Sequence, residues 1–420
     1  MSTKRLYHYD PYLMEFTCSV TKCTGPVNLK DYSFPIYMIE VDRTAFYPMS
    51  GGQPCDKGTL SGIDVLDIVE SEDTESIMHI TNSSIAEGQN IIGKVDFDRR
   101  FDHMQQHTGQ HILSAAFVHL FDIATKGFHL GEEYVTIDLD SSEITEDQCA
   151  AAERMACDVA FHNHQILISF HASEEAANLP SRKQAAVTTG DIRIVEVEGF
   201  DKCMCCGTHV DSTGEVGIIK ILKTEKIRGM TRVEFICGRR ALKDYAAKNM
   251  ILSELSNMLS THPSDVSHSI TKMQNQYRDM KKQIDALTSE LLVYQADEMY
   301  TKATIEPFSK VRMVTKIFNG VGFDSLKMTA SKVCQKMNVV TLFASKSDNN
   351  VQFLFQRSEN VDLDVNKLLK SVLDVVDGKG GGSAMLAQGG AKDVVSLESI
   401  MSITSKKVEA ELSLQTPLLS

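Results

Sequence analysis

The chain has 420 residues, of which 42% are hydrophobic and 24% are charged, so it holds enough apolar material for packed cores and is not an intrinsically disordered chain. At about 150 residues per domain, this length predicts two or three domains. The formal net charge of −13 excludes nucleic-acid binding through overall positive charge, although it leaves room for a local basic site.

The charge is unevenly distributed along the chain. Residues 1–240 hold 22 Lys+Arg and 36 Asp+Glu, a net charge of −14, whereas residues 305–385 hold 11 Lys+Arg and 8 Asp+Glu, a net charge of +3. No apolar run approaches the roughly 20 residues of a membrane helix, and the first residues lack the apolar segment of a secretion signal. We therefore expect a cytoplasmic protein without membrane attachment, whose ten cysteines are reduced thiols or metal ligands.

Residues 1–95 are expected to form a β-rich, barrel-like subdomain. Alternating apolar runs bounded by turn residues predict strands at 35–41, 63–69 and 76–80. The segment 50–54, Ser-Gly-Gly-Gln-Pro, interrupts these strands as a loop.

Residues 96–240 are expected to form a two-layer α+β core. A helix is predicted over 99–120, where histidines recur at i, i+4 spacing beside an apolar stripe. Thr145 and Gln148 form a capping box that starts a second helix, which runs to about residue 162. Helices on a mostly antiparallel sheet are the expected arrangement. The predicted strands of this region are 134–139, 192–197, 216–222 and 231–237.

Residues 241–304 are expected to form a helical linker. From Val266 to Tyr294, apolar residues recur at spacings of four and three residues. This spacing is typical of a coiled-coil seam, here about four heptads long and beginning after Pro263. Two interpretations fit this seam. It either packs on apolar positions within 251–259 as an intramolecular hairpin, which we favour, or it forms a homodimer.

Residues 305–420 are expected to form a compact α/β domain that contains a glycine-rich stretch, Gly378-Lys379-Gly380-Gly381-Gly382, followed by Gln388-Gly389-Gly390. The predicted elements are strands at 311–317, 339–343 and 351–355 and helices at 325–337 and 364–376.

Two pairs of metal-ligand residue types carry the strongest chemical signal. His107 and His111 lie four residues apart on the predicted helix, so both imidazoles leave the same face. About a hundred residues later, Cys205-Cys206-Gly207-Thr208-His209 supplies a thiol and a third imidazole. One thiolate and three imidazoles suit zinc. No Glu follows His107, so the His-Glu-x-x-His pattern of zinc peptidases is absent.

Spacing alone leaves the identity of the thiolate open, because Cys203 and Cys206 offer a second, Cys-x-x-Cys pairing. His103 extends the histidine stripe but is one ligand too many, so we expect it to be solvated or to support a ligand. The remaining seven cysteines are interpreted as small buried apolar groups.

The loop that contains Ser50, Gly51, Gly52 and Gln53 is the second candidate. Paired glycines allow a backbone to approach a ligand closely, and the Gln53 amide can donate and accept hydrogen bonds. Taken alone, however, a plain strand-connecting turn is the better interpretation.

Together these segments resemble the long form of the AlaX family, the freestanding alanyl-tRNA editing proteins related to the editing domain of alanyl-tRNA synthetase. The resemblance rests on Arg43-Thr44-Ala45-Phe46-Tyr47-Pro48 before the glycine loop, on residues 99–111, and on Met204-Cys205-Cys206-Gly207-Thr208-His209. The glycine-rich stretches at 378–382 and 387–390 resemble the DHH-associated domain. Four positions depart from the usual pattern of the family, namely Met49, Cys206, Ser383 and Ala384.

This resemblance implies one zinc ion per chain on His107, His111, Cys205 and His209, which selects Cys205 from the three candidate thiols. It implies a substrate site at Ser50, Gly51, Gly52 and Gln53, with the Thr44 hydroxyl facing the amino acid, and tRNA contacts at Lys379, Gly380, Gly381 and Gln388. The fold implied is α+β, with a barrel-like subdomain at 1–95, a zinc editing core at 96–240, a coiled-coil linker at 241–304 and a DHH-associated domain at 305–420.

The activity implied is hydrolysis of the ester that joins a wrong amino acid, serine or glycine, to alanine tRNA. A small apolar pocket cannot strongly reject an analogue with one added hydroxyl, so a separate editing site supplies the missing discrimination. Thr44 and Gln53 are our candidates for binding the serine hydroxyl, and we name no general base. The alternatives are a non-catalytic zinc-stabilised tRNA-binding module and, last, an interaction protein built on the coiled coil. We expect salt-sensitive tRNA affinity carried mainly by residues 305–385, and a homodimer, if formed, through the coiled coil or the C-terminal domain.

Overall fold

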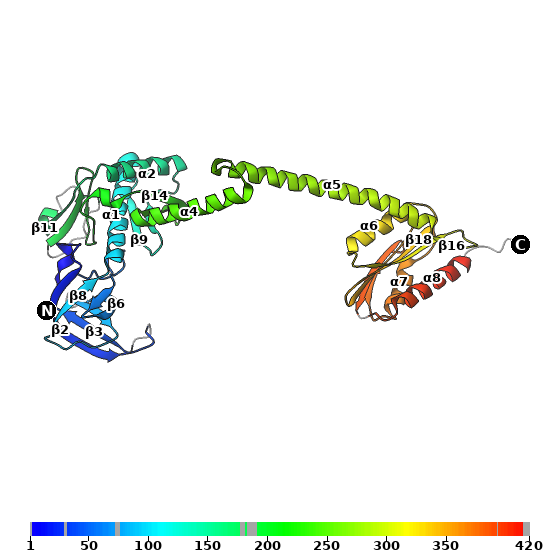
Figure 1. The fold of residues 1–420 in the computed structure, drawn as a ribbon, viewed down its shortest axis with the longest axis horizontal. Helices are drawn as coiled ribbons and strands as arrows, with labels where there is room; N and C mark the ends of the chain where they lie inside the picture. The colour runs from blue at the N-terminus through cyan, green and yellow to red at the C-terminus, as the bar shows by residue number, and fades with distance from the viewer. Residues whose placement is uncertain are drawn as a thin grey trace. The chain divides into compact units, whose positions relative to one another are not determined.

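The computed structural model describes residues 2–28, 32–71, 76–176, 181–182, 191–392 and 394–414. The chain divides into two compact units, Met1–Met258 and Leu259–Ser420. Among the described residues, no helix combines the length and the apolar character that a membrane span requires. Figure 1 shows the elements of each unit.

The first unit begins with a closed six-stranded barrel, so the β-rich start expected from the sequence is confirmed. Inward side chains alternate with outward ones, as β8 illustrates, where Ile91 and Val95 are buried. Gly93 lies between them because a Cβ there would overlap the Phe16 ring. In order around the barrel the strands are β2 (Glu15–Val27), β3 (Ile36–Val41), β7 (Ile77–Thr81), β6 (Ile63–Glu70), β5 (Gly58–Leu60) and β8 (Asn90–Val95). The short strand β1 (Lys4–Arg5) pairs in parallel with β4 (Arg43–Thr44).

The 25-residue helix α1 (Phe97–Phe121) follows the barrel directly. Asp96 caps its N-terminus by accepting a hydrogen bond from the backbone of Arg99, and Asp122 ends it in the left-handed conformation at φ 55°. Most of its length is buried, so this helix is the central element of the unit rather than a surface helix.

An antiparallel sheet packs beside α1. Its strands, in order, are β14 (Ile219–Ile227), β15 (Met230–Cys237), β10 (Val135–Leu139) and β9 (Thr125–Leu130). The helix α2 (Glu146–Phe161) starts at the predicted Thr145–Gln148 capping box. The predicted strand at 216–222 is wrong in its first half, because a 3-10 turn occupies Thr213–Val216 and Gly217, at φ 68°, separates it from β14.

A second, three-stranded antiparallel sheet carries the cysteine-rich segment. It consists of β11 (Ile166–Ala172), β12 (Asp191–Val197) and β13 (Asp201–Met204), in that order. A one-turn helix, α3 (Ser173–Ala176), follows β11, and the unit closes with α4 (Gly238–Leu259), whose last residue falls in the second unit.

The second unit starts with the 36-residue helix α5 (Val266–Thr301). The predicted seam lies along it, and most of its side chains are exposed, for example Tyr277 at 66% and Leu287 at 65%. Because α4 and α5 belong to different units, the intramolecular hairpin stays a prediction.

The remainder of the second unit is a six-stranded sheet covered by helices on both faces. Buried side chains of α6 (Phe323–Cys334) and of the end of α5 pack with Phe343 and Leu354, whereas α7 (Val365–Leu373) and α8 (Leu397–Leu414) pack with Leu342 and Phe353 on the other side. The strands, in order, are β16 (Thr304–Ile305), β17 (Arg312–Asn319), β18 (Val339–Ser347), β19 (Asn350–Arg357), β21 (Leu386–Lys392) and β20 (Lys379–Gly382). Among the described strands of this sheet, only β17 and β18 pair in parallel, and α6 connects them.

Candidate active site

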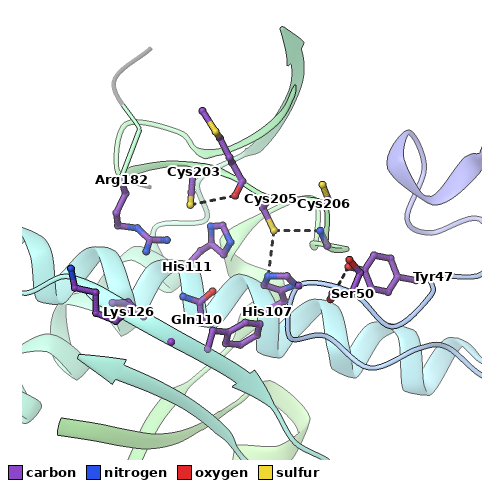
Figure 2. A pocket seen from close by; sticks show the side chains of 16 residues that line it. Tyr47, Ser50, His107, Gln110, His111, Lys126, Arg182, Cys203, Cys205 and Cys206 are labelled. Atoms are coloured by element: carbon purple, nitrogen blue, oxygen red, sulfur yellow. Dashed lines mark hydrogen bonds between the residues drawn. The ribbon is translucent and has the colours of Figure 1, made fainter. Parts of the chain in front are cut away.

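Four metal-ligand side chains converge in the first unit, and their ligand atoms all lie within 4.8 Å of one another. His107 and His111 project from adjacent turns of α1, while Cys205 and His209 come from the loop after β13, as Figure 2 shows for the first three. The Cys205 Sγ lies 3.4 Å from Nε2 of His107 and 3.3 Å from Nε2 of His209. The structure thus brings together all four side chains named as ligands.

These separations fit a tetrahedral metal ion. Zinc bonds of roughly 2.0–2.3 Å to nitrogen and sulfur place neighbouring ligand atoms about 3.3–3.7 Å apart. One sulfur and three imidazole nitrogens are also the donor types that zinc accepts. The cluster could therefore hold a metal ion.

Each of the three imidazoles turns its other nitrogen toward a polar side chain. Nδ1 of His107 donates to Oε1 of Gln53 at 2.8 Å, and Nδ1 of His209 lies 3.1 Å from the Thr108 hydroxyl. Nδ1 of His111 faces the Asp201 carboxylate at 3.4 Å. Outer partners of this kind fix the orientation of a ligating imidazole, so the Nε2 atoms are held toward the centre of the cluster.

The loop that carries Cys205 is held by its own backbone and by Arg193. The Gly207 backbone N–H donates to the Cys205 sulfur at 3.3 Å, and Nη1 of Arg193 donates to the carbonyl oxygens of Cys205 and Gly207 at 2.7 and 2.9 Å. A Cβ at Gly207 would overlap the His107 ring. Glycine is therefore required for the loop to lie this close to the helix.

Burial sets the protonation of the metal-free cluster. It lowers the pKa of both His107 and His209 well below the usual histidine value, so both imidazoles are neutral with Nε2 free to bind. Burial also raises the pKa of Cys205 to about 12, which keeps its thiol protonated until a metal displaces the proton.

A cavity of about 510 Å³ opens beside the cluster, large enough for a small-molecule portion of a substrate. Lys126 of β9 and Arg182 are its cationic wall residues, and none of the described wall residues is acidic. The wall is completed by Tyr47, Ser50, Gly51, His107, Gln110, His111, Thr125, Gly127, Phe128 and residues 203–207.

The predicted substrate loop lies at this cavity, but its residues have different environments. Ser50 and Gly51 line the cavity. Gly52 packs against Phe128, which stacks on the His107 ring at 5.0 Å between centroids. Gln53 is fully buried, and besides His107 it bonds Thr208 through both its amide nitrogen and its carbonyl.

Thr44 lies inside the barrel rather than in the cavity wall. It is fully buried and shares a hydrogen bond of 2.9 Å with Nε2 of His79. Since the polar groups of Thr44 and Gln53 bond within the protein, their role in binding a serine hydroxyl stays a prediction.

The other predicted site residues are not members of the cluster. Lys379, Gly380, Gly381 and Gln388 belong to the β20–β21 hairpin of the second unit, where Gly381 faces Gln388 in the strand register. His103 is 2% exposed and is not part of the cluster, so the alternative that it is solvated is wrong. Its pKa is lowered to about 3 by burial and by the nearby guanidinium groups of Arg99, Arg240 and Arg100.

Several residues of the site were not foreseen from sequence, namely Gln110, Lys126, Phe128, Arg182, Arg193 and Asp201. Asp201 lies four residues before Cys205, which is the only sequence signal that could have drawn attention to it.

Comparison with known proteins gives matches along the whole chain. The family described as "Threonyl and Alanyl tRNA synthetase second additional domain" matches residues 192–234, and the DHHA1 domain matches residues 310–411. Alanyl-tRNA editing protein AlaX-L of Pyrococcus horikoshii is 29% identical over 423 residues, which covers 97% of this chain and 99% of the relative. Alanyl-tRNA editing protein Aarsd1 of Rattus norvegicus is 32% identical over 302 residues, 68% of this chain and 71% of the relative.

Alanine--tRNA ligase of Pyrococcus abyssi is 30% identical over 406 residues. The match covers 93% of this chain but only 42% of the ligase, so the chain spans less than half of that relative. Among solved structures, the C-Ala domain of Aquifex aeolicus alanyl-tRNA synthetase aligns with 24% of this chain at 24% identity and a TM-score of 0.22, which is too low to support a structural conclusion.

Proposed function

Because this chain belongs to the family of alanyl-tRNA editing proteins, we propose that it hydrolyses the ester between a wrongly attached amino acid and the 3′ end of alanine tRNA. Serine is the first candidate amino acid and glycine the second. The observation that carries the proposal is the convergence of four ligand side chains, of which His107, His111 and Cys205 line a cavity and His209 lies behind them. A cluster that only stabilised the fold would not need to face a cavity of this size.

One zinc ion per chain is part of the proposal. Bound there, zinc would supply a Lewis acid that polarises a carbonyl or lowers the pKa of a water molecule. His107, His111, Cys205 and His209 would hold the ion, and such chemistry would also need a coordination position open to water or substrate. We therefore assign no general base.

The residues of the chain provide binding and orientation. Gln53, Thr108 and Asp201 hold the imidazoles, and Phe128 covers one face of His107 and limits its contact with water. Lys126, whose pair with Asp140 is 56% exposed on both sides, can offer positive charge at the cavity, which suits the phosphate groups next to a tRNA 3′ end despite the overall charge of −13. The charge of Arg182 is balanced by Asp201.

We extend the proposal to the second unit and to the domain division. The β20–β21 hairpin, with Lys379, Gly380, Gly381 and Gln388, would contact the tRNA body, with hydrolysis in residues 1–240 and most of the affinity in residues 305–385. A homodimer through α5 or the C-terminal unit, and a cytoplasmic location, belong to the same proposal. Truncation before residue 305 should then weaken tRNA binding.

Release of labelled serine from alanine tRNA tests the function directly, with alanine-charged tRNA as the comparison. The wild-type chain should release serine much faster than alanine. Cys205→Ala should lose both zinc and activity, whereas Cys206→Ala, which changes the neighbouring exposed thiol, should keep its zinc. A zinc-loaded wild type that releases no serine would instead support the non-catalytic tRNA-binding module.

A further inference from the structure

A buried ion pair lies directly behind one of the candidate metal ligands. Asp201 begins β13 and is 7% exposed. Its carboxylate accepts two hydrogen bonds from Arg182, from Nε at 2.9 Å and from Nη2 at 3.1 Å. The same carboxylate places Oδ2 3.4 Å from Nδ1 of His111. Three groups that can carry charge therefore share one buried site next to the cluster.

We infer that Asp201 is a positioning residue that holds His111 ready for the metal, and that Arg182 holds Asp201 and connects it to the cavity wall. The inference rests on the proposed metal site. It assigns Asp201 no contact with substrate.

The geometry around His111 leaves Asp201 as its partner. The imidazole is 3% exposed, and among the described residues its Nδ1 has no well-formed hydrogen bond, so the Asp201 carboxylate at 3.4 Å is the charged group that this nitrogen faces. A carboxylate at Nδ1 keeps the proton on that nitrogen, so the Nε2 lone pair faces the cluster, and it increases the basicity of the ligand.

Arg182 is the charge partner of this carboxylate. Its guanidinium donates both hydrogen bonds to Asp201, and the two side chains are only 13% and 3% exposed, so Arg182 balances the carboxylate while the cluster is free of metal.

Arg182 and Asp201 should consequently affect metal binding in opposite directions. Without Asp201, His111 loses its orienting charge and Arg182 stays as an unpaired cation near the incoming metal. Without Arg182, the carboxylate is unpaired in the metal-free protein and gains most from a nearby cation. Simple damage to the fold would weaken metal binding in both variants.

Zinc affinity of the full-length chain, measured by competition with a chromophoric chelator, tests this inference. Asp201→Asn should bind zinc about 10- to 100-fold more weakly than wild type. Arg182→Gln should bind zinc as tightly as wild type or more tightly. Asp138→Asn is the matched control, because Asp138 forms a similar two-bond pair with Arg232, at 2.6 and 2.8 Å, outside the cavity wall. The control should stay within twofold of wild type.

The double variant Asp201→Asn/Arg182→Gln covers the case in which Asp201→Asn does not fold. Removing both charges of a buried pair is far less destabilising than removing one. The double variant should fold and still bind zinc at least about tenfold more weakly than wild type.

Two results would overturn the inference. One is an Asp201→Asn or double variant with zinc affinity within twofold of wild type, and the other is an Arg182→Gln variant as weak as Asp201→Asn. A wild-type chain that fails to bind zinc would instead refute the metal site itself, so the two failures can be told apart.

Discussion

Arg100 of α1 and Asp56 of the loop between β4 and β5 form an ion pair that is 0% exposed on both sides. Nε of Arg100 donates to both carboxylate oxygens at 3.0 and 3.1 Å, and its terminal nitrogens also donate to the carbonyl oxygens of Pro11 and Ala45. The Asp56 carboxylate accepts a further hydrogen bond from the backbone of Tyr47. One side chain thus joins the barrel to the helix that carries two candidate ligands.

Replacing Arg100 with Met should lower the free energy of unfolding of the first unit by about 3–5 kcal/mol, because it leaves the Asp56 carboxylate buried and unpaired. Denaturant titration of the full chain measures the loss. Arg239→Gln is the control, since its pair with Asp98 on the same helix is largely exposed and should contribute less than about 1 kcal/mol. Equal effects of the two variants would contradict this role of Arg100.

The variant Gln53→Leu distinguishes two roles for Gln53, which are orienting the His107 imidazole and selecting the amino acid of the substrate. Since the Gln53 amide bonds His107 and Thr208, its loss should lower zinc affinity by about 10-fold or more. The ratio of serine to glycine release by the zinc-saturated variant should stay at the wild-type value. A changed ratio at unchanged zinc affinity would instead favour direct contact of Gln53 with the serine hydroxyl.

Gly207→Ala should remove most bound zinc, because the added methyl group would occupy the space of the His107 ring and force the loop away from α1. Metal content after gel filtration measures the effect. Cys206→Ala alters the preceding residue without this overlap and should retain about one zinc per chain. Full zinc occupancy in Gly207→Ala would show that the loop can shift without loss of the cluster.

His79 should make the barrel sensitive to acid. Burial lowers the pKa of His79 to about 4 in the folded chain, whereas the unfolded value is 6.5. The unfolded state therefore binds the additional proton as the pH falls through 6.5, and stability is lost between pH 6.5 and pH 4. At pH 4.5 this loss should be about 2 kcal/mol.

The variant His79→Gln keeps hydrogen-bonding groups for Thr44 and for the carbonyl of Ile39 but cannot gain that proton. The fall in unfolding free energy between pH 7 and pH 4.5 should therefore be about 2 kcal/mol smaller than in wild type. Denaturant titrations at the two pH values decide this, and an unchanged difference would refute the assignment to His79.

Lys126 should contribute to the salt dependence of tRNA hydrolysis. Its Nζ lies 3.2 Å from Asp140, but both side chains are 56% exposed, so the pair can open toward a phosphate at the cavity. Lys126→Gln should reduce the slope of log(kcat/KM) against log[salt] by about 0.7, the value for one phosphate contact on a single strand.

Lys226→Gln is the matched control for Lys126→Gln. Lys226 forms a similar exposed pair with Glu143 at 3.3 Å but is not part of the cavity wall. If both substitutions changed the slope equally, the effect would reflect overall charge rather than a contact at the cavity.

The features that sequence predicted are those set by local spacing. The i, i+4 histidines predicted a helix that presents both imidazoles on one face, and the Thr145–Gln148 pattern predicted the start of α2. Near residue 217 local reasoning failed, because apolar alternation cannot detect the positive φ of Gly217 that ends one segment and starts another.

The parts that sequence did not predict depend on which segments meet in space. Spacing left Cys203, Cys205 and Cys206 as alternatives, and only the packing of the β13 loop against α1 brings Cys205 to the histidines. The Arg182–Asp201 pair joins residues that periodicity does not relate. Thr44 belongs to a two-residue strand, which is too short for alternation to tell an inward side chain from an outward one.

The close contact between Gly52 and Phe128 affects the access of solvent to the metal-ligand cluster. A Cβ at Gly52 would lie 2.9 Å from the Phe128 ring, and that ring covers His107. Any larger residue at position 52 would therefore lift the aromatic ring and let bulk solvent reach the imidazole. Because position 52 is glycine, the Phe128 ring can stay over His107 and keep bulk solvent away from that imidazole. A residue of the barrel loop thus protects a cluster whose four candidate ligands all come from other segments.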